Sequence, residues 1–194
     1  MAERGSKLMA IDTQKLLALL PTIAPWKEAA LLLMLQTGCI TTELQRLASG
    51  NLDLDATVPC LRVTGDLKTA SRERTVPLVL GLDRLQELKE LLDDGSGFAL
   101  GSEFSGKDDS NVSHQLNSVV RKIAPDATCY SCRHTVKANG LSRGVDSHLI
   151  ALIGGWRDSL GINTVQLAYG AAAYTSPETL AQLQSAMKVI NRHL

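Results

Sequence analysis

Apolar side chains recur along most of this chain at the spacing of α-helices. Residues 26–36 are almost all apolar, which predicts a buried helix, and Asp12 and Thr13 are suitable caps for a shorter helix that reaches Leu20. Further stretches repeat apolar residues every three or four positions, as helices with one buried face do. These stretches are residues 41–49, 83–92, 112–123, 130–141, 147–153, 162–169 and 177–190. Residues 95–109 are rich in Gly, Ser and Asp and predict a loop.

One part of the chain has a different pattern. Residues 60–64 and 74–78 are strand-like runs joined by a polar loop, so they predict a β-hairpin. Pro77 has no backbone N–H to donate, which places the second run at a sheet edge or at the end of a strand. The expected fold class is α+β, mainly helical, with a small antiparallel hairpin or three-stranded sheet packed at one side.

Length and composition fit one domain. The chain has 194 residues, 44% hydrophobic and 21% charged, so it can bury a full core. We expect an N-terminal arm over residues 1–11 and a domain over residues 12–194. No apolar run reaches the roughly 18 residues of a membrane span, and residues 1–9 lack the apolar core of a signal peptide. We therefore expect a cytoplasmic protein with reduced cysteines and no membrane partner.

Short motifs in a fixed order carry the candidate chemistry. T-G-C-I-T-T-E-L stands at residues 37–44, and L-K-T at residues 67–69 precedes S-R-E-R-T-V-P-L at residues 71–78. Y-S-C-R-H-T-V follows at residues 130–136, then G-G-W at 154–156 and Y-G at 169–170. In these motifs and their order the chain resembles the catalytic domain of the tyrosine recombinases, the phage integrase family. The resemblance covers roughly residues 12–190.

The resemblance implies site-specific DNA integration and recombination, with a role for five residues. Tyr169 would attack a DNA phosphate and form a 3′-phosphotyrosyl link. Arg133 would bind the phosphoryl oxygens, because a guanidinium can donate two parallel hydrogen bonds. Lys68 would give a proton to the leaving 5′ hydroxyl. Trp156 would donate its indole N–H to a phosphate oxygen, and Tyr130, which replaces a histidine of the family, keeps a hydroxyl donor.

The implied partners are duplex DNA and other recombinase subunits, either further copies of this chain or different ones, and no cofactor or metal is implied. Nucleic-acid modules are usually basic, whereas this chain has 20 basic and 20 acidic residues and a net charge of zero. We therefore expect weak, salt-sensitive binding to DNA. The family also normally carries a helical DNA-clamping domain before the catalytic one, and we expect none here because the first predicted helix begins near residue 13.

Ile40 stands where the family has its first catalytic arginine. An aliphatic side chain cannot donate a hydrogen bond to phosphate, and the loss of one preorganised donor costs on the order of 3 kcal/mol of transition-state stabilisation in other enzymes. Arg46, the next arginine along the chain, would lie on a different face of the helix. An alternative function is therefore a degenerate, weakly active or inactive integrase-like module that binds DNA or another recombinase.

Other interpretations of single residues stay open. Tyr174 is a second candidate nucleophile, because the interval between Trp156 and Tyr169 is longer than the family norm. Lys68 could be an ordinary solvated lysine, Tyr169 a half-buried helix tyrosine and Trp156 a packing residue.

A different chemistry is suggested by Cys129, Cys132 and His134. Their spacing is that of half a zinc site or of a redox pair. Cys39 and Cys60 are isolated in the sequence, and no second pair of ligands follows. The helical surroundings also differ from the βαβ context of thioredoxin-like redox sites. We therefore favour the recombinase interpretation.

Overall fold

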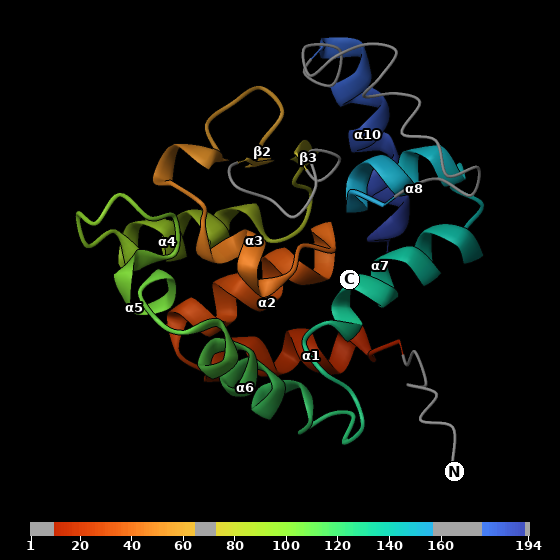
Figure 1. Cartoon of the computed structure of the whole chain (residues 1–194). Helices are drawn as coiled ribbons and strands as arrows, with labels where there is room; N and C mark the ends of the chain where they lie inside the picture. Colours follow the sequence, from red (N-terminus) through yellow and green to blue (C-terminus); the bar gives the residue numbers. More distant parts are fainter. Residues whose placement is uncertain (1–9, 65–72, 157–175, 193–194) are drawn as a thin grey trace.

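The computed structural model describes residues 10–64, 73–156 and 176–192. Among these residues, three α-helices are followed by a small sheet and then by further helices (Figure 1). The first half contains α1 (Thr13–Leu19), α2 (Pro25–Thr37), α3 (Thr41–Gln45), β1 (Leu52–Asp53), β2 (Cys60–Val63) and β3 (Arg74–Pro77), with short 3₁₀ turns at Leu20–Thr22 and Ser49–Asn51. The second half contains α4 (Leu82–Leu92), α5 (Gly101–Ser105), α6 (Asp109–Val120), α7 (Ser131–Ser142), α8 (Ser147–Gly154) and α10 (Pro177–Ile190).

The sheet is antiparallel, with the strand order β1-β2-β3. Cys60 lies opposite Pro77, and Val63 opposite Arg74, so β3 is an edge strand that ends at its proline. This confirms the expectation that Pro77 marks a sheet edge, where its missing N–H leaves no ladder hydrogen bond unmade. The fold class predicted from the sequence is also confirmed.

The apolar core consists of two clusters. The larger one surrounds α2, in which every residue from Ala29 to Leu35 is buried, and includes side chains of α1, α3, α4 and α6. The smaller one joins β3, α7, α8 and α10, which lie beside one another in Figure 1. Cys132 of α7 belongs to the larger cluster, and Val136, one turn later, belongs to the smaller. Helix α7 therefore crosses the boundary between the two clusters, and Arg133 sits at that boundary.

A buried glutamine holds the segment after β3 against α2. The Gln36 side chain, with no exposed surface, donates to the Leu80 carbonyl and accepts from the backbone N–H groups of Val79 and Leu80. Burying an amide is favourable only when its donors and acceptors are satisfied, and here three backbone groups satisfy it. This contact fixes where the edge strand leaves the sheet relative to the end of α2.

Most predicted elements are present with small changes at their ends, and one prediction was wrong. Residues 95–109 are not entirely loop, because α5 forms within them. Phe104 of α5 is completely buried, with its ring 5.5 Å from that of Trp26, so long-range packing stabilises a helix too short to show a periodic pattern. Helix α3 ends at Gln45 rather than near residue 49. The helix predicted at 162–169 lies outside the described residues.

Candidate functional site

Arg133 connects the start of α7 to the end of α2. Its side chain lies in the first turn of α7, the residue is 4% exposed, and its Nη1 donates to the Gly38 carbonyl over 2.7 Å. Gly38 is the C-cap of α2 and has a φ of 69°, a left-handed conformation that glycine adopts without strain. Gly38 is the guanidinium's hydrogen-bond partner among the described residues, so most of its five N–H groups stay available for a ligand.

Trp156 lies against the Arg133 guanidinium. The Arg133 Cζ is 4.5 Å from the centroid of the indole ring, a cation–π distance. The glycines before the tryptophan make this position possible. A Cβ atom at Gly154 would lie 2.0 Å from the ring, and one at Gly155 would lie 2.9 Å from Arg74. The G-G-W turn therefore places a ring where any larger residue at 154 would collide with it.

Arg74 forms a buried ion pair with Glu43. The side chains are 4% and 1% exposed, with Nη2 to Oε2 at 3.0 Å and Nη1 to Oε1 at 3.2 Å. The Arg74 Nε donates to the Ile153 carbonyl over 2.8 Å. Burial alone would raise the pKa of Glu43, but Arg74 outweighs burial and holds that pKa below its usual value. The pair thus links β3, α3 and the end of α8.

Arg74 was not among the site residues predicted from the motifs. It lies in the predicted strand two residues before Val76, so both side chains belong on the same face of that strand. The period of two along the predicted strand could therefore have indicated that Arg74 is buried on the same face as Val76 and needs a carboxylate partner.

Tyr130 is the N-cap residue of α7 and is 46% exposed. Its ring meets that of His134 edge-on, with the centroids 5.0 Å apart. Burial lowers the pKa of His134, and the nearby charges of Arg133 and Lys137 lower it further. The neutral imidazole is therefore the favoured form beside this cationic group.

The sequence pattern of the phage integrase family matches residues 7–174. The chain belongs to the phage integrase family. The solved structure of XerA recombinase has a similar fold, with a TM-score of 0.61 and 19% sequence identity. The alignment covers 91% of this chain and 62% of the XerA chain, so this chain spans less than two thirds of the length of that relative. No curated protein matches the sequence significantly.

In this integrase-family chain, the structure brings together two of the five predicted site residues, Arg133 and Trp156, and places Tyr130 at the start of the same helix. Lys68, Tyr169 and the alternative nucleophile Tyr174 lie outside the described residues.

Ile40 has no donor to offer where the family has its first arginine. Its backbone N–H donates to the Glu43 Oε2 over 3.1 Å, and its side chain is half-buried at the N-cap of α3. Glu43 therefore binds Arg74 and the Ile40 backbone at once. The Arg74 cation is matched by this carboxylate, and in the described region Arg133 is the buried cation of the group without a carboxylate partner.

Cys129 and Cys132 are both buried. Burial raises the pKa of Cys129 to about 11 and also raises that of Cys132, so both thiols are protonated near neutral pH. Within residues 10–64, 73–156 and 176–192, no three His, Cys, Asp or Glu side chains lie close enough together to hold a metal ion. In the same ranges, no helix has the length and apolar character needed to cross a membrane.

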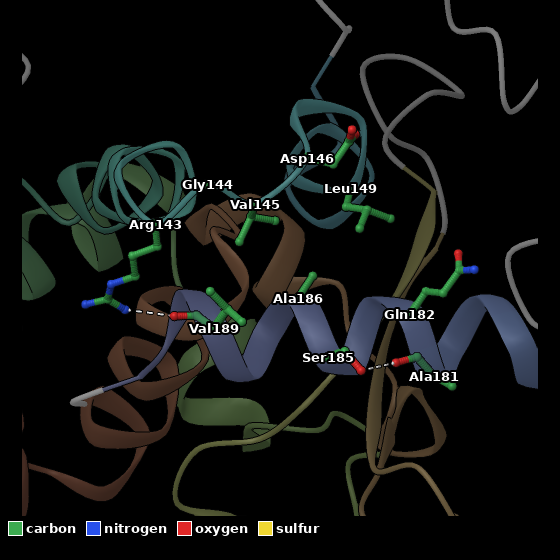
Figure 2. A pocket seen from close by; sticks show the side chains of 10 residues that line it. All are labelled: Arg143, Gly144, Val145, Asp146, Leu149, Ala181, Gln182, Ser185, Ala186 and Val189. Atoms are coloured by element: carbon green, nitrogen blue, oxygen red, sulfur yellow. Dashed lines mark hydrogen bonds between the residues drawn. The ribbon is translucent and has the colours of Figure 1, made fainter.

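A hollow of about 530 Å³ lies between the α7–α8 turn, α8 and α10 (Figure 2). Val145, Leu149, Ala186 and Val189 line it, and Arg143 donates to the Val189 carbonyl at the end of α10. None of the predicted site residues lines this hollow. The Arg143 contact satisfies a carbonyl of the last turn of α10 and places a cation at the negative end of its dipole.

Proposed function

We propose that this chain cuts and rejoins duplex DNA as an integrase-type recombinase. The observation that supports the proposal best is the Arg133 guanidinium. It is held by the Gly38 carbonyl and the Trp156 ring, and it keeps most of its donors for a ligand. A planar guanidinium matches the geometry of two phosphoryl oxygens, and a preorganised donor stabilises charge that develops during reaction without having to reorganise.

In the proposed reaction, the Tyr169 hydroxyl oxygen attacks the phosphorus of one DNA phosphate. The bond from phosphorus to the 5′ oxygen breaks as the phosphotyrosyl bond forms, and the proton of the tyrosine hydroxyl passes to water. Lys68 gives a proton to the leaving 5′ oxygen, so the products are a 3′-phosphotyrosyl link and a free 5′ hydroxyl. Attack by a 5′ hydroxyl on this link reverses the steps and joins the strands.

Tyr130 and Trp156 would complete the hydrogen bonding of the phosphate with a phenolic hydroxyl and an indole N–H. The chain itself supplies these groups, and we propose no cofactor. The proposed setting is the cytoplasm, with several subunits assembled on duplex DNA, each acting on one strand. Binding by one chain alone should be weak, because few phosphates are contacted, and it should weaken further as salt rises.

A second candidate function is a module that binds DNA or another recombinase without cutting. Ile40 favours it, because the site then has one preorganised arginine where the family has two. Loss of such a donor slows other enzymes about a hundred- to a thousandfold.

One experiment separates the two functions. The chain is incubated with a pool of random-sequence duplexes, each carrying a nick that lets a cut end diffuse away, and the mixture is then denatured. Strand transfer predicts DNA that stays attached to the protein and enriched sequences among the attached strands. A chain that shifts the duplexes in a native gel but retains no DNA after denaturation is the binding module.

A further inference from the structure

The two cations nearest to Arg133, Arg74 and Lys137, differ in whether a carboxylate of the described residues pairs with them. Arg74 is neutralised by both oxygens of Glu43, and its Nε is taken by the Ile153 carbonyl. It holds the site together but has little left to offer a ligand. A second cation for a phosphate must therefore come from another residue.

Lys137 meets this need. It lies one turn after Arg133, and residues four apart share one face of a helix. Its Nζ is 5.8 Å from the centroid of the Trp156 ring, which also carries the Arg133 guanidinium at 4.5 Å. Two cations thus share one indole.

The Lys137 ammonium is available to a ligand. The residue is exposed, and none of the carboxylates in the described part of the chain pairs with it. Like charges held close together repel, so an anion between them would relieve the repulsion. Burial is the main cause of the lowered pKa of His134, and the charges of Arg133 and Lys137 lower it further, in agreement with a positive field on this face of the helix.

We propose that Lys137 is the second phosphate-binding cation of this site and contacts the same DNA phosphate as Arg133, in place of the guanidinium missing at residue 40. The inference rests on the proposed binding of DNA but not on strand cleavage. The Trp156 ring holds the lysine side chain beside Arg133 before DNA arrives. The long, flexible stem then lets the ammonium leave the ring and reach the phosphate.

The first test measures how the affinity of the chain for a random-sequence 30-base-pair duplex depends on salt. Lys137→Met should lower the slope of log affinity against log salt by about one, the contribution of one phosphate contact, and Lys137→Arg should restore it. Lys122→Met is the matched control. Lys122 is also exposed but lies away from the site. The N-terminal end of α6 lies beside the site, where Asp109 accepts a hydrogen bond from Thr41, and Lys122 follows the opposite end of the same helix.

Equal slopes for Lys137→Met and the unmodified chain would overturn the proposal, as would an equal loss in Lys122→Met. Failure of the unmodified chain to bind the duplex would also overturn it. Circular dichroism of each variant is the check that these exposed substitutions leave the fold intact.

The second test asks whether Lys137 and residue 40 serve the same phosphate. Ile40→Arg is introduced into the unmodified chain and into Lys137→Met. If Lys137 fills the role of the missing arginine, Ile40→Arg should recover the lost affinity in the Lys137→Met background and add much less in the unmodified chain. Equal gains in both backgrounds would mean that the residues contact different phosphates, which contradicts the proposal. Absence of a covalent DNA adduct would contradict strand transfer alone, because these readouts need only binding.

Discussion

Arg74 and Glu43 form a two-point ion pair near Arg133, with nitrogen–oxygen distances of 3.0 and 3.2 Å. The pair joins the edge strand β3 to α3, the helix for which Ile40 is the N-cap residue. Arg74 is the first residue of β3 and stands six positions after Lys68 in the sequence, so the pair fixes the start of the strand that follows the proposed acid.

Arg74→Met should destabilise the protein strongly. The substitution leaves the Glu43 carboxylate buried without its cation, and breaking a buried pair from one side costs about 3–5 kcal/mol. Adding Glu43→Gln should recover part of this loss, because a neutral amide is cheaper to bury than an unpaired charge. Urea denaturation gives the free energy of unfolding of the unmodified chain, of Arg74→Met and of the double variant. Arg62→Met removes the exposed pair with Asp53 and should cost far less. Similar losses of unfolding free energy in Arg62→Met and Arg74→Met would show that burial does not determine how much the ion pair stabilises the fold.

The same pair predicts a dependence of stability on pH. The folded state lowers the pKa of Glu43, so ionised Glu43 stabilises the fold at neutral pH. This contribution is complete above the pKa that Glu43 has in the unfolded chain, and it is lost as the pH falls through the lower folded value. Glu43→Gln should therefore lose less stability than the unmodified chain between pH 7 and acid. Parallel curves of unfolding free energy against pH would contradict the assignment.

Gly154→Ala should displace Trp156 from Arg133. The added methyl group would lie 2.0 Å from the indole ring, so either the ring or the turn must move. We expect a loss of about 1–3 kcal/mol in stability, as for other overpacked sites, together with a change in tryptophan fluorescence. Gly50→Ala is the control, since nothing lies within 4 Å of a Cβ atom there. If Gly154→Ala leaves the emission spectrum and the urea midpoint unchanged, the ring does not occupy this place in solution.

Tyr169→Phe should abolish any covalent DNA adduct, whereas Tyr174→Phe should leave most of it. Removal of one hydroxyl deletes the attacking atom with little effect on packing. The measurement is the amount of DNA retained after denaturation, followed by mass spectrometry of the modified peptide. An adduct mapped to Tyr174 would assign the nucleophile to that residue instead.

Ile40→Arg should raise adduct formation on the order of tenfold or more, because a guanidinium can donate two hydrogen bonds where the lysine ammonium is a point charge. The half-buried N-cap position of Ile40 leaves a longer side chain a route to solvent. Ile40→Met is the control for side-chain length without charge. An Ile40→Arg protein that folds and binds DNA but forms no more adduct would show that residue 40 is not what limits the reaction.

Several elements follow from local sequence alone. Helix α10 spans the predicted residues 177–190, because Ser176 caps it, Pro177 suits its first position and its apolar residues are helically spaced. The motifs around Arg133 and Trp156 likewise indicated the family, since a motif is read from residues close together in sequence.

Tertiary structure decided which residues contact one another in the site. Arg133 meets Gly38 across 95 residues, and Arg74 meets Glu43 across 31. Nothing in the local sequence distinguishes Lys137 from other helix lysines, and only the packing of the G-G-W turn places Trp156 beside it. The sequence pattern around a residue indicates whether the residue is buried and whether it lies in a helix or a strand. It does not indicate which residue, distant in the sequence, it contacts. That partner depends on how the two apolar clusters pack on either side of α7, and this packing is a property of the whole chain.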